Sequence, residues 1–507
     1  MLQRVTRRWG AAHQRRATKI GILRDAYAVQ PGACAGASRG TVSHSALPGA
    51  CAAITDCDDV STSVSLGHMT AANGQRSLIF GALRPVTRLA LLAALTAGLL
   101  AACTSLAPAN FQPGKSPRFS GSVPVKTFSL MLDAARVQAT TRTQWEAIAR
   151  ANALVVLNSW DYRLIPLLKR ANPRLQVWVY KNLSGVRSDD CSTDNGECGA
   201  CPAGVHDTAH LSSGMGYCWL RRHHPQWLLR AAATGRQLRF RGYPHIWETD
   251  YGSRAYQRRW LANVLDDVRQ HGWDGVQVDN ALSTAGAFGV AARYPTDTAV
   301  QHATYSALRY LGPALRRAGV GAVFNVGYAP MFRGLWERWL RPVQGLEQEF
   351  YLSYSAAPNA VGVSAWGAYQ QEALSCAAQR KRCWFHAGDY SSGVTSQTRD
   401  YALASYLLAN DGRQLWAAGT TLQGPPASVL TLGAPTGAMK QLGPAWARYF
   451  SGGLVVVNPS GTTVKVRLGG RYVDDGRRLS SITLGPASGA ILRAAAAGQQ
   501  PAERAPG

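Results

Sequence analysis

A carboxylate and an amide, Asp279 and Asn280, directly follow the short apolar run Val276-Gln277-Val278. The run has the composition of a buried strand, and residues 272–275 before it form a turn-like sequence. In parallel α/β folds the chemistry collects at the carboxyl ends of the strands, and a buried carboxylate without a partner is costly. We therefore interpret Asp279 as a catalytic residue. The alternative is that Asp279 caps a following helix, although Asn280 could itself serve as that cap.

Hydrolysis of a glycosidic bond needs a second carboxyl group, because one protonates the leaving oxygen while the other attacks or activates water. Glu347 and Glu349 are two residues apart in an expected strand and so face the same side of it. Since Glu349 is nearer the carboxyl end, we assign Asp279 as nucleophile or base and Glu349 as general acid. The alternative for either glutamate is an ion pair with an arginine inside the fold. The sequence leaves retention or inversion of configuration open.

Other polar and aromatic residues at or near strand ends are candidates for contacts with sugar hydroxyls or sugar faces. Glu248 and Asp250 form a second acidic cluster between aromatic residues, and the alternative role of this cluster is the start of the next helix. The predicted substrate-binding residues are Trp160, Asp161, Tyr180, Lys181, Trp247, Glu248, Asp250, Asn280, Asn325, Tyr328, Glu347, His386 and Asp389.

The elements that must position these residues are strand-like runs that alternate with helical patterns. The expected strands are residues 127–132, 154–158, 175–182, 276–279, 322–325, 345–350, 382–386 and 415–418. Helical patterns occur between them, including residues 144–150, 223–233, 256–269, 298–317 and 400–410. This alternation predicts an α/β fold, a (β/α)₈ TIM barrel. An open doubly wound sheet is the alternative, but no glycine-rich phosphate loop follows the first strand.

The sequence changes character at both ends of the expected barrel. After the barrel domain (122–424), residues 425–494 contain short strand and turn patterns, which predict a small C-terminal antiparallel β domain, and residues 495–507 are an expected disordered tail. Residues 1–68 have no sustained periodicity and are interpreted as disordered or as an over-extended gene start.

Residues 69–102 have the order of a lipoprotein signal peptide. Arg84 and Arg88 precede an apolar run at residues 89–100, and small residues then lead to Cys103. The run is too short for a mature transmembrane helix. We expect Cys103 to be lipidated, residues 103–121 to form a tether, and the protein to be exported and anchored to the membrane of the cell envelope. A fortuitous cysteine after a buried helix is the alternative.

Six further cysteines follow Cys103, an even number that suits an oxidising compartment. They are Cys191, Cys198, Cys201, Cys218, Cys376 and Cys383. Cys376 and Cys383 are close enough to pair across a turn between a helix and a strand. The spacing of Cys198 and Cys201 also suits a zinc site, but only one such pair occurs, so disulfides are favoured over metal.

The composition excludes some classes of protein. A hydrophobic content of 46% is ordinary for a globular chain. The formal net charge of +25 comes from scattered arginines and not from a stripe with interleaved aromatics, so nucleic-acid binding is not favoured. A polyanionic substrate or an arginine-rich composition explains the charge better. We expect neither a cofactor nor a metal.

Four short motifs resemble glycoside hydrolase-like family 15. They are Tyr180-Lys181-Asn182, His224-Pro225-x-Trp227, Ile246-Trp247-Glu248-Thr249-Asp250-Tyr251, and the run from Gly272 to Asn280. The resemblance covers about residues 125–490 and implies a (β/α)₈ barrel in an exported, carbohydrate-active protein. The Asp279-Asn280 strand end is also similar to that of polygalactosaminidase and α-galactosidase-like barrels, in which the matching aspartate is catalytic.

The favoured function is a lipid-anchored glycoside hydrolase that acts on a poly- or oligosaccharide. The alternative is a barrel that binds glycans without cleaving them, or a structural envelope lipoprotein, and such a protein needs no carboxyl group of raised pKa. An esterase or deacetylase is less favoured, because neither a Gly-x-Ser-x-Gly elbow nor a His-Glu-x-x-His motif is evident after residue 68.

Overall fold

The computed structural model describes residues 111, 125–189, 211–354, 356–388, 393–419, 429 and 431–495. Within these ranges, none of the helices combines the length and the hydropathy needed to cross a membrane. The predicted signal peptide, the lipidation site Cys103, the cysteines Cys191, Cys198 and Cys201, and Asp389 lie outside the described residues.

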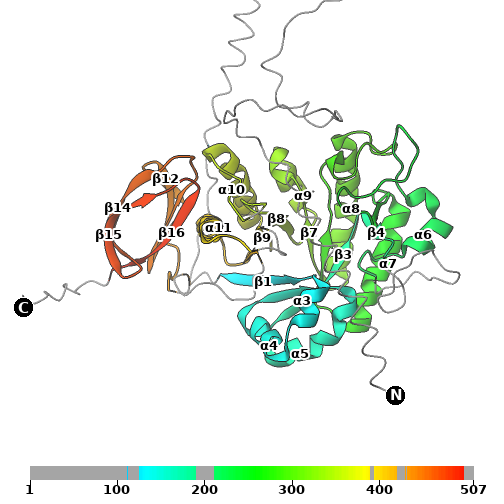
Figure 1. The fold of residues 1–507 in the computed structure, drawn as a ribbon, viewed down its shortest axis with the longest axis horizontal. Helices are drawn as coiled ribbons and strands as arrows, with labels where there is room; N and C mark the ends of the chain where they lie inside the picture. Colours follow the sequence, from blue (N-terminus) through cyan, green and yellow to red (C-terminus); the bar gives the residue numbers. More distant parts are fainter. Residues whose placement is uncertain are drawn as a thin grey trace, which may run out of the picture. The chain divides into compact units, whose positions relative to one another are not determined.

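Eight parallel strands close into a barrel, with each strand paired to the next one along the chain (Figure 1). The strands are β1 (Lys126–Met131), β2 (Leu154–Leu157), β3 (Gln176–Asn182), β6 (Gly275–Asp279), β7 (Gly321–Asn325), β8 (Leu346–Glu349), β9 (Trp384–Ala387) and β10 (Leu415–Ala418). A two-stranded antiparallel pair, β4 (Gly185–Arg187) and β5 (Ile246–Glu248), is inserted between β3 and β6. The (β/α)₈ barrel predicted from the sequence is therefore confirmed, and all eight expected strands are present.

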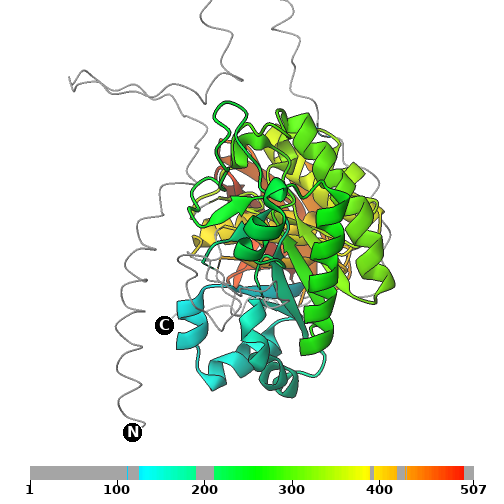
Figure 2. The same cartoon turned by 90° about the vertical axis from the view of Figure 1, so that its right-hand side faces the viewer.

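Helices connect the strands and lie outside the barrel (Figure 2). They are α3 (Ala134–Ala139), α4 (Arg142–Ala151), α5 (Ile165–Ala171), α6 (Tyr217–His223), α7 (Arg254–His271), α8 (Asp297–Arg317), α9 (Leu335–Leu340), α10 (Val363–Ala378) and α11 (Ser396–Ala409).

The predicted helix at residues 223–233 is wrong. Helix α6 ends at His223, and Pro225 begins a single 3₁₀ turn, Pro225–Trp227, in which the rings of His224 and Trp227 stack with their centroids 4.0 Å apart. A proline disfavours helical backbone in the residue before it, and His224 accordingly leaves the helix with φ −140°. The chain then pairs as isolated bridges, so the periodicity of this segment was misleading.

Large aromatic side chains fill the lower interior of the barrel. Trp178 of β3 packs against Trp384 of β9, which in turn packs against Phe128 of β1, with ring centroids 5.0 Å apart in both pairs. Gly275 and Gly321 on the neighbouring strands leave the space for the Trp178 indole, because a Cβ atom on either glycine would lie within 2.6 Å of that ring. This apolar floor closes the barrel below the strand ends and excludes water from beneath them.

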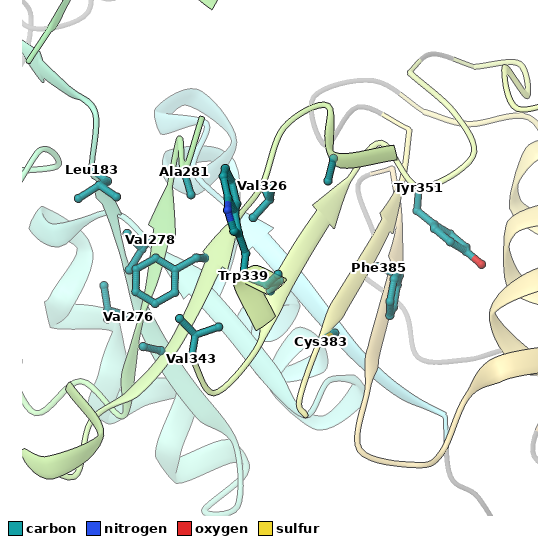
Figure 3. Close-up of a cluster of buried hydrophobic side chains, with 14 of the residues drawn as sticks. Leu183, Val276, Val278, Ala281, Val326, Trp339, Val343, Tyr351, Cys383 and Phe385 are labelled. Carbon is teal, nitrogen blue, oxygen red and sulfur yellow. The ribbon is translucent and has the colours of Figure 1, made fainter. Parts of the chain in front are cut away.

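A second apolar layer lies between the strands and the surrounding helices. Val276 and Val278 of β6 point into it, as do Trp339 of α9 and Phe385 of β9 (Figure 3). The alternation is strict along β6, since Gln277 and Asp279 face the barrel interior instead.

The C-terminal region forms an antiparallel sheet, as predicted. Its strands are β11 (Lys440–Leu442), β12 (Ala445–Phe450), β13 (Gly453–Asn458), β14 (Val464–Asp474), β15 (Arg477–Leu484) and β16 (Ser488–Ala494). Arg448 of β12 is buried and donates hydrogen bonds to the carbonyl oxygens of Leu407 and Asn410 at the end of α11. The sheet is thereby joined to the last barrel helix.

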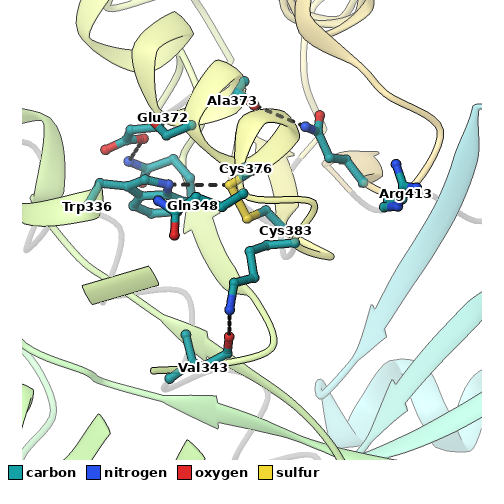
Figure 4. Close-up of a disulfide and its surroundings, with 12 residues drawn as sticks. Trp336, Val343, Gln348, Glu372, Ala373, Cys376, Cys383 and Arg413 are labelled. Atoms are coloured by element: carbon teal, nitrogen blue, oxygen red, sulfur yellow. Dashed lines mark hydrogen bonds between the residues drawn. A yellow bond between two sulfur atoms is a disulfide. The ribbon is translucent and has the colours of Figure 1, made fainter. Parts of the chain in front are cut away.

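Cys376 at the end of α10 and Cys383 before β9 form a disulfide, which confirms the predicted pairing (Figure 4). Trp336 of α9 donates a hydrogen bond to Cys376 Sγ at 3.4 Å. Cys218 is also disulfide-bonded. Phe111, inside the predicted tether, packs its ring edgewise against Trp366 of α10 and Trp446 of β12.

The substitution Gly275→Ala tests the packing of the barrel floor. The added methyl would lie 2.5 Å from the Trp178 ring and 2.7 Å from the carbonyl oxygen of Gly321, so the free energy of unfolding should fall by about 1–3 kcal/mol. Chemical unfolding measures the change. Gly437→Ala is the control, because its Cβ enters open space and should leave stability unchanged. Equal stability of both variants would contradict a tightly packed floor.

Candidate active site

Asp279 ends β6 with its carboxylate inside the barrel mouth. Tyr180 of β3 donates its hydroxyl to Asp279 Oδ2 at 2.7 Å, and the amide of Asn325 of β7 donates to Asp279 Oδ1 at 2.9 Å. Burial raises the pKa of Asp279, while the hydrogen bonds from Tyr180, the backbone of Asn280 and the Asn325 amide lower it. Helix capping is therefore not the role of Asp279, and the next helical turn begins only at Ala285.

Glu349 ends β8 and is held by the same amide. Asn325 Nδ2 also donates to Glu349 Oε2 at 2.7 Å, so one nitrogen bonds to both carboxylates. Because the two hydrogen bonds are 2.9 and 2.7 Å long, the two oxygens they reach are no more than their sum, 5.6 Å, apart. The two carboxylates that the sequence pairs as catalytic residues thus come together at the strand ends.

Glu347 lies one layer deeper on the same face of β8. It is fully buried and accepts a hydrogen bond from Gln277 Nε2 of β6 at 2.6 Å. Burial raises the pKa of Glu347 well above its ordinary value, and the nearby charges of Glu349 and Asp279 raise it further. The expected arginine ion pair is not what holds Glu347.

A pocket opens beside this carboxylate pair. Three of its residues, Asn280, Tyr328 and Phe350, have left-handed backbone with φ of 58°, 61° and 62°. They follow three adjacent barrel strands, β6, β7 and β8, and such backbone is costly for residues other than glycine. The lining residues are Phe240, Asn280, Leu282, Asn325, Gly327, Tyr328, Gln348, Glu349, Phe350 and Tyr354.

Lys181 and Asp250 are both occupied by protein groups. Lys181 is fully buried and forms an ion pair with Asp267 of α7 at 2.6 Å, and its ammonium also donates to Ser159 and to the carbonyl of Leu211. Lys181 therefore joins β3 to α7 and, contrary to the sequence-based prediction, does not face the barrel mouth. Asp250 pairs with Arg293 at 2.7 Å and accepts a hydrogen bond from the Tyr294 hydroxyl.

Two further predicted substrate-binding residues, Trp247 and Glu248, lie on β5 and are not among the residues that line the pocket. The guanidinium of Arg239 lies 4.0 Å from the Trp247 ring centroid, and Tyr217 stacks on the same indole at 5.4 Å. Glu248 is fully buried, and burial raises its pKa well above the ordinary value. Their contacts with substrate remain predictions.

Three more candidates are placed near strand ends. Trp160 and Asp161 belong to a 3₁₀ turn after β2, Ser159–Leu164, where burial raises the pKa of Asp161 to about 6. His386 of β9 is the register neighbour of Glu349, and its Nε2 lies 2.9 Å from the carbonyl oxygen of Gly419. These residues are also predictions as substrate contacts.

Several residues of the site were missed in the sequence. Phe350 is the last residue of the expected sixth strand and Tyr354 comes four residues later, so their position at a strand end was an available signal. Gln277 was signalled by being a polar residue between two valines of a buried strand. Phe240 comes from the β4–β5 insertion, for which the sequence carries no local signal. Within the described ranges, no group of three or more His, Cys, Asp or Glu side chains is arranged to hold a metal ion.

Two carboxyl groups at the strand ends of a parallel barrel are an arrangement that the hydrolysis of a glycosidic bond can use. The chain belongs to hypothetical glycosyl hydrolase family 15, whose model matches residues 169–454, more than half of the sequence. The protein is therefore a glycoside hydrolase, and its substrate is a carbohydrate. No curated protein matches the sequence significantly.

The solved structures that are similar to this chain include the following three. A β-L-arabinopyranosidase of family GH27 from Geobacillus stearothermophilus has 12% identity and a TM-score of 0.40, covering 75% of this chain and 98% of its own. The glycoside hydrolase domain of PelA from Pseudomonas aeruginosa has 12% identity and a TM-score of 0.35, covering 60% and 96%. Ega3 from Aspergillus fumigatus, in complex with galactosamine, has 13% identity and a TM-score of 0.35, covering 62% and 97%.

The substitution Tyr180→Phe tests the electrostatics of Asp279. It removes a hydrogen bond that lowers the pKa of Asp279, so that pKa should rise. Because attack requires the ionised carboxylate, the acid limb of the kcat/KM profile should move to higher pH. Kinetics on any glycoside that the protein turns over measure this shift. Tyr305→Phe on α8 is the control, and an acid limb that stays in place in Tyr180→Phe would contradict the assignment.

Proposed function

We propose that this protein is a retaining glycoside hydrolase in which Asp279 is the nucleophile and Glu349 the general acid and base. The observation that carries the proposal is the single Asn325 amide bonded to both carboxylates, which keeps the bonded oxygens within 5.6 Å, the sum of hydrogen bonds of 2.9 and 2.7 Å. Retaining enzymes separate their carboxyl groups by about 5–5.5 Å, whereas inverting enzymes need about 6.5–9.5 Å to admit a water molecule.

Two steps complete the reaction. In the first, Glu349 protonates the glycosidic oxygen while Asp279 attacks the anomeric carbon, which releases the leaving sugar as an alcohol and forms a glycosyl ester on Asp279. In the second, the ionised Glu349 takes a proton from water, the water oxygen attacks the anomeric carbon, and the Asp279 carboxylate is released. Each step inverts the anomeric carbon, so the product keeps the original configuration.

The hydrogen bonds favour Asp279 over Glu349 as the nucleophile. The Tyr180 hydroxyl, the Asn325 amide and the backbone of Asn280 all stabilise the ionised form of Asp279. These donors counteract the burial that raises its pKa, so a charged carboxylate persists in a site with little water. They are also placed to stabilise the charge that returns to Asp279 when the glycosyl ester is cleaved.

The pocket favours a sugar polymer or oligomer as substrate. The rings of Phe350 and Tyr354 lie 5.2 Å apart in the pocket wall, and Tyr354 is 37% exposed. Aromatic faces pack against the C–H faces of sugar rings, while Asn280 supplies an amide for hydroxyl groups.

The substitutions Asp279→Asn and Glu349→Gln test the catalytic pair. Each removes one carboxyl group without changing its size, and each should reduce kcat by about 100-fold or more. A screen of polysaccharides provides the substrate, and NMR of the first-formed anomer reports the stereochemistry. Asp266→Asn, at an exposed position of α7, is the control. Unchanged turnover in either variant would remove that residue from the mechanism, and an inverted product would contradict the assignment of Asp279 as nucleophile.

We also propose that the protein is exported and lipid-anchored through Cys103. Two observations support this location: the charged, apolar and small-residue order of residues 84–103, and the Cys376–Cys383 disulfide, which suits an oxidising compartment.

The substitution Cys103→Ser tests the anchor. Cells fed a labelled fatty acid should label the wild-type protein and not the variant, and the variant should leave the membrane fraction. Ser116→Ala is the control, since Ser116 lies in the proposed tether and stays in the mature protein. Membrane association that survives in Cys103→Ser would contradict lipid anchoring at this residue.

A further inference from the structure

Glu347 is a third carboxyl group directly beneath the proposed catalytic pair. It lies on β8 two residues before Glu349, its side chain is fully buried, and it faces the barrel interior above the tryptophan floor. Its register neighbour on the adjacent strand is Asn325. Since adjacent strands lie about 4.8 Å apart, Glu347 is next to the residue that holds both reactive carboxylates.

If Glu347 is ionised, some of the buried side-chain oxygens of Glu347, Asn325 and Gln277 have no hydrogen-bond donor. Glu347 Oε2 accepts from Gln277, but no residue in the described ranges donates to Glu347 Oε1, Asn325 Oδ1 or Gln277 Oε1, although all three are buried. Each of these atoms is an acceptor only, so a donor is required among them. A buried acceptor without a donor destabilises the folded state.

We propose that Glu347 is a neutral carboxylic acid in the resting protein and that its hydroxyl is the donor that fixes the amide of Asn325 between Asp279 and Glu349. A proton on Oε1 turns one of the three acceptors into a donor. The acceptor on the adjacent strand is Asn325 Oδ1, and a bond to it orients the amide so that its nitrogen points at the reactive pair. Glu347 is thus a positioning residue, and this part of its role rests on the proposed function.

The surroundings favour the neutral form. On the strands around Glu347, the titratable groups that face the barrel interior are Asp279 on β6, Glu349 on β8, Tyr180 on β3 and His386 on β9. The lysine on these strands, Lys181 of β3, points outward to its ion pair with Asp267 of α7 and does not face Glu347. An ionised Glu347 would be a second negative charge beside Asp279, and a third whenever Glu349 is ionised, in a site closed from below by Trp178 and Trp384. Burial and these two charges raise the pKa of Glu347, in agreement with the geometry.

Infrared difference spectroscopy on Glu347→Gln tests the neutral acid without any substrate. The wild-type minus variant spectrum at neutral pH should contain the C=O stretch of a protonated carboxyl, and this band should shift in the Glu349→Gln background, where a neighbouring carboxyl group is replaced by an amide. Glu372→Gln is the matched control, because Glu372 is also buried and bonded to a glutamine but lies on α10, outside the barrel. Its band should not respond to Glu349→Gln. The band of an ionised carboxylate in place of the protonated one would overturn the proposal.

Unfolding experiments give a second, independent readout. A carboxyl group can stay protonated in the folded protein and ionise in the unfolded chain. The free energy of unfolding then falls as the pH rises above the pKa of that group in the unfolded chain. Between about pH 5 and about pH 8, the free energy of unfolding should therefore fall more in the wild-type protein than in Glu347→Gln. Parallel curves for the two proteins would overturn the neutral acid.

Kinetics then separate a positioning role from a catalytic one. Glu347→Gln keeps the shape and a donor, so its kcat should stay within about ten-fold of wild type, whereas Glu347→Ala should lose about 100-fold or more. A loss in Glu347→Gln as large as that in Glu349→Gln would overturn the positioning role. If Asp279→Asn remains fully active while the protonated band is present, the proposed catalytic pair fails and the protonation of Glu347 stands.

Discussion

Two carboxyl groups held within hydrogen-bonding reach of one nitrogen repel each other when both are ionised, and the mouth of this barrel places a shared donor between them. The Asn325 amide has two N–H groups, and it directs one to Asp279 and the other to Glu349. This geometry requires that β6, β7 and β8 be adjacent and in register, so the closure of the barrel is a condition for the site. An aspartate at position 325 would replace the shared donor with a third charge and separate the pair.

The interior of the barrel changes in character from the floor to the mouth. Trp178, Trp384 and Phe128 form an apolar floor, and the Gln277–Glu347 pair lies above it. Glu349 lines the pocket, and Asp279 lies beside it, joined to Glu349 through Asn325. Burial above this apolar floor raises the pKa of Asp279 and of Glu347. Hydrogen bonds to each carboxyl group lower its pKa again, from different donors in the two cases. The left-handed backbone of Asn280, Tyr328 and Phe350 costs about 1–3 kcal/mol at each position, and the packed layers around the barrel stabilise it.

The sequence predicts the barrel well because each strand is a short apolar run between turn signals, and parallel strands necessarily gather their carboxyl ends. Asp279 and Glu349 were predictable for that reason. The role of Lys181 was not, because a strand's next residue faces the opposite layer, and its partner Asp267 lies on a helix 86 positions away. The function of Asn325 as a shared donor also depends on the register of three strands, which no local pattern encodes. The helix expected at residues 223–233 failed because Pro225 outweighs the surrounding periodicity.

Phe111 has a consequence for where this enzyme can work. Its ring is packed against Trp366 and Trp446, so the chain is fastened to the folded protein at that point. With Cys103 as the lipidated residue, only eight peptide units join the acyl group to this fastening, and a fully extended chain of that length reaches less than about 30 Å. An anchor of that length would hold the enzyme close to the bilayer, so the glycans within its reach would be those near the membrane surface.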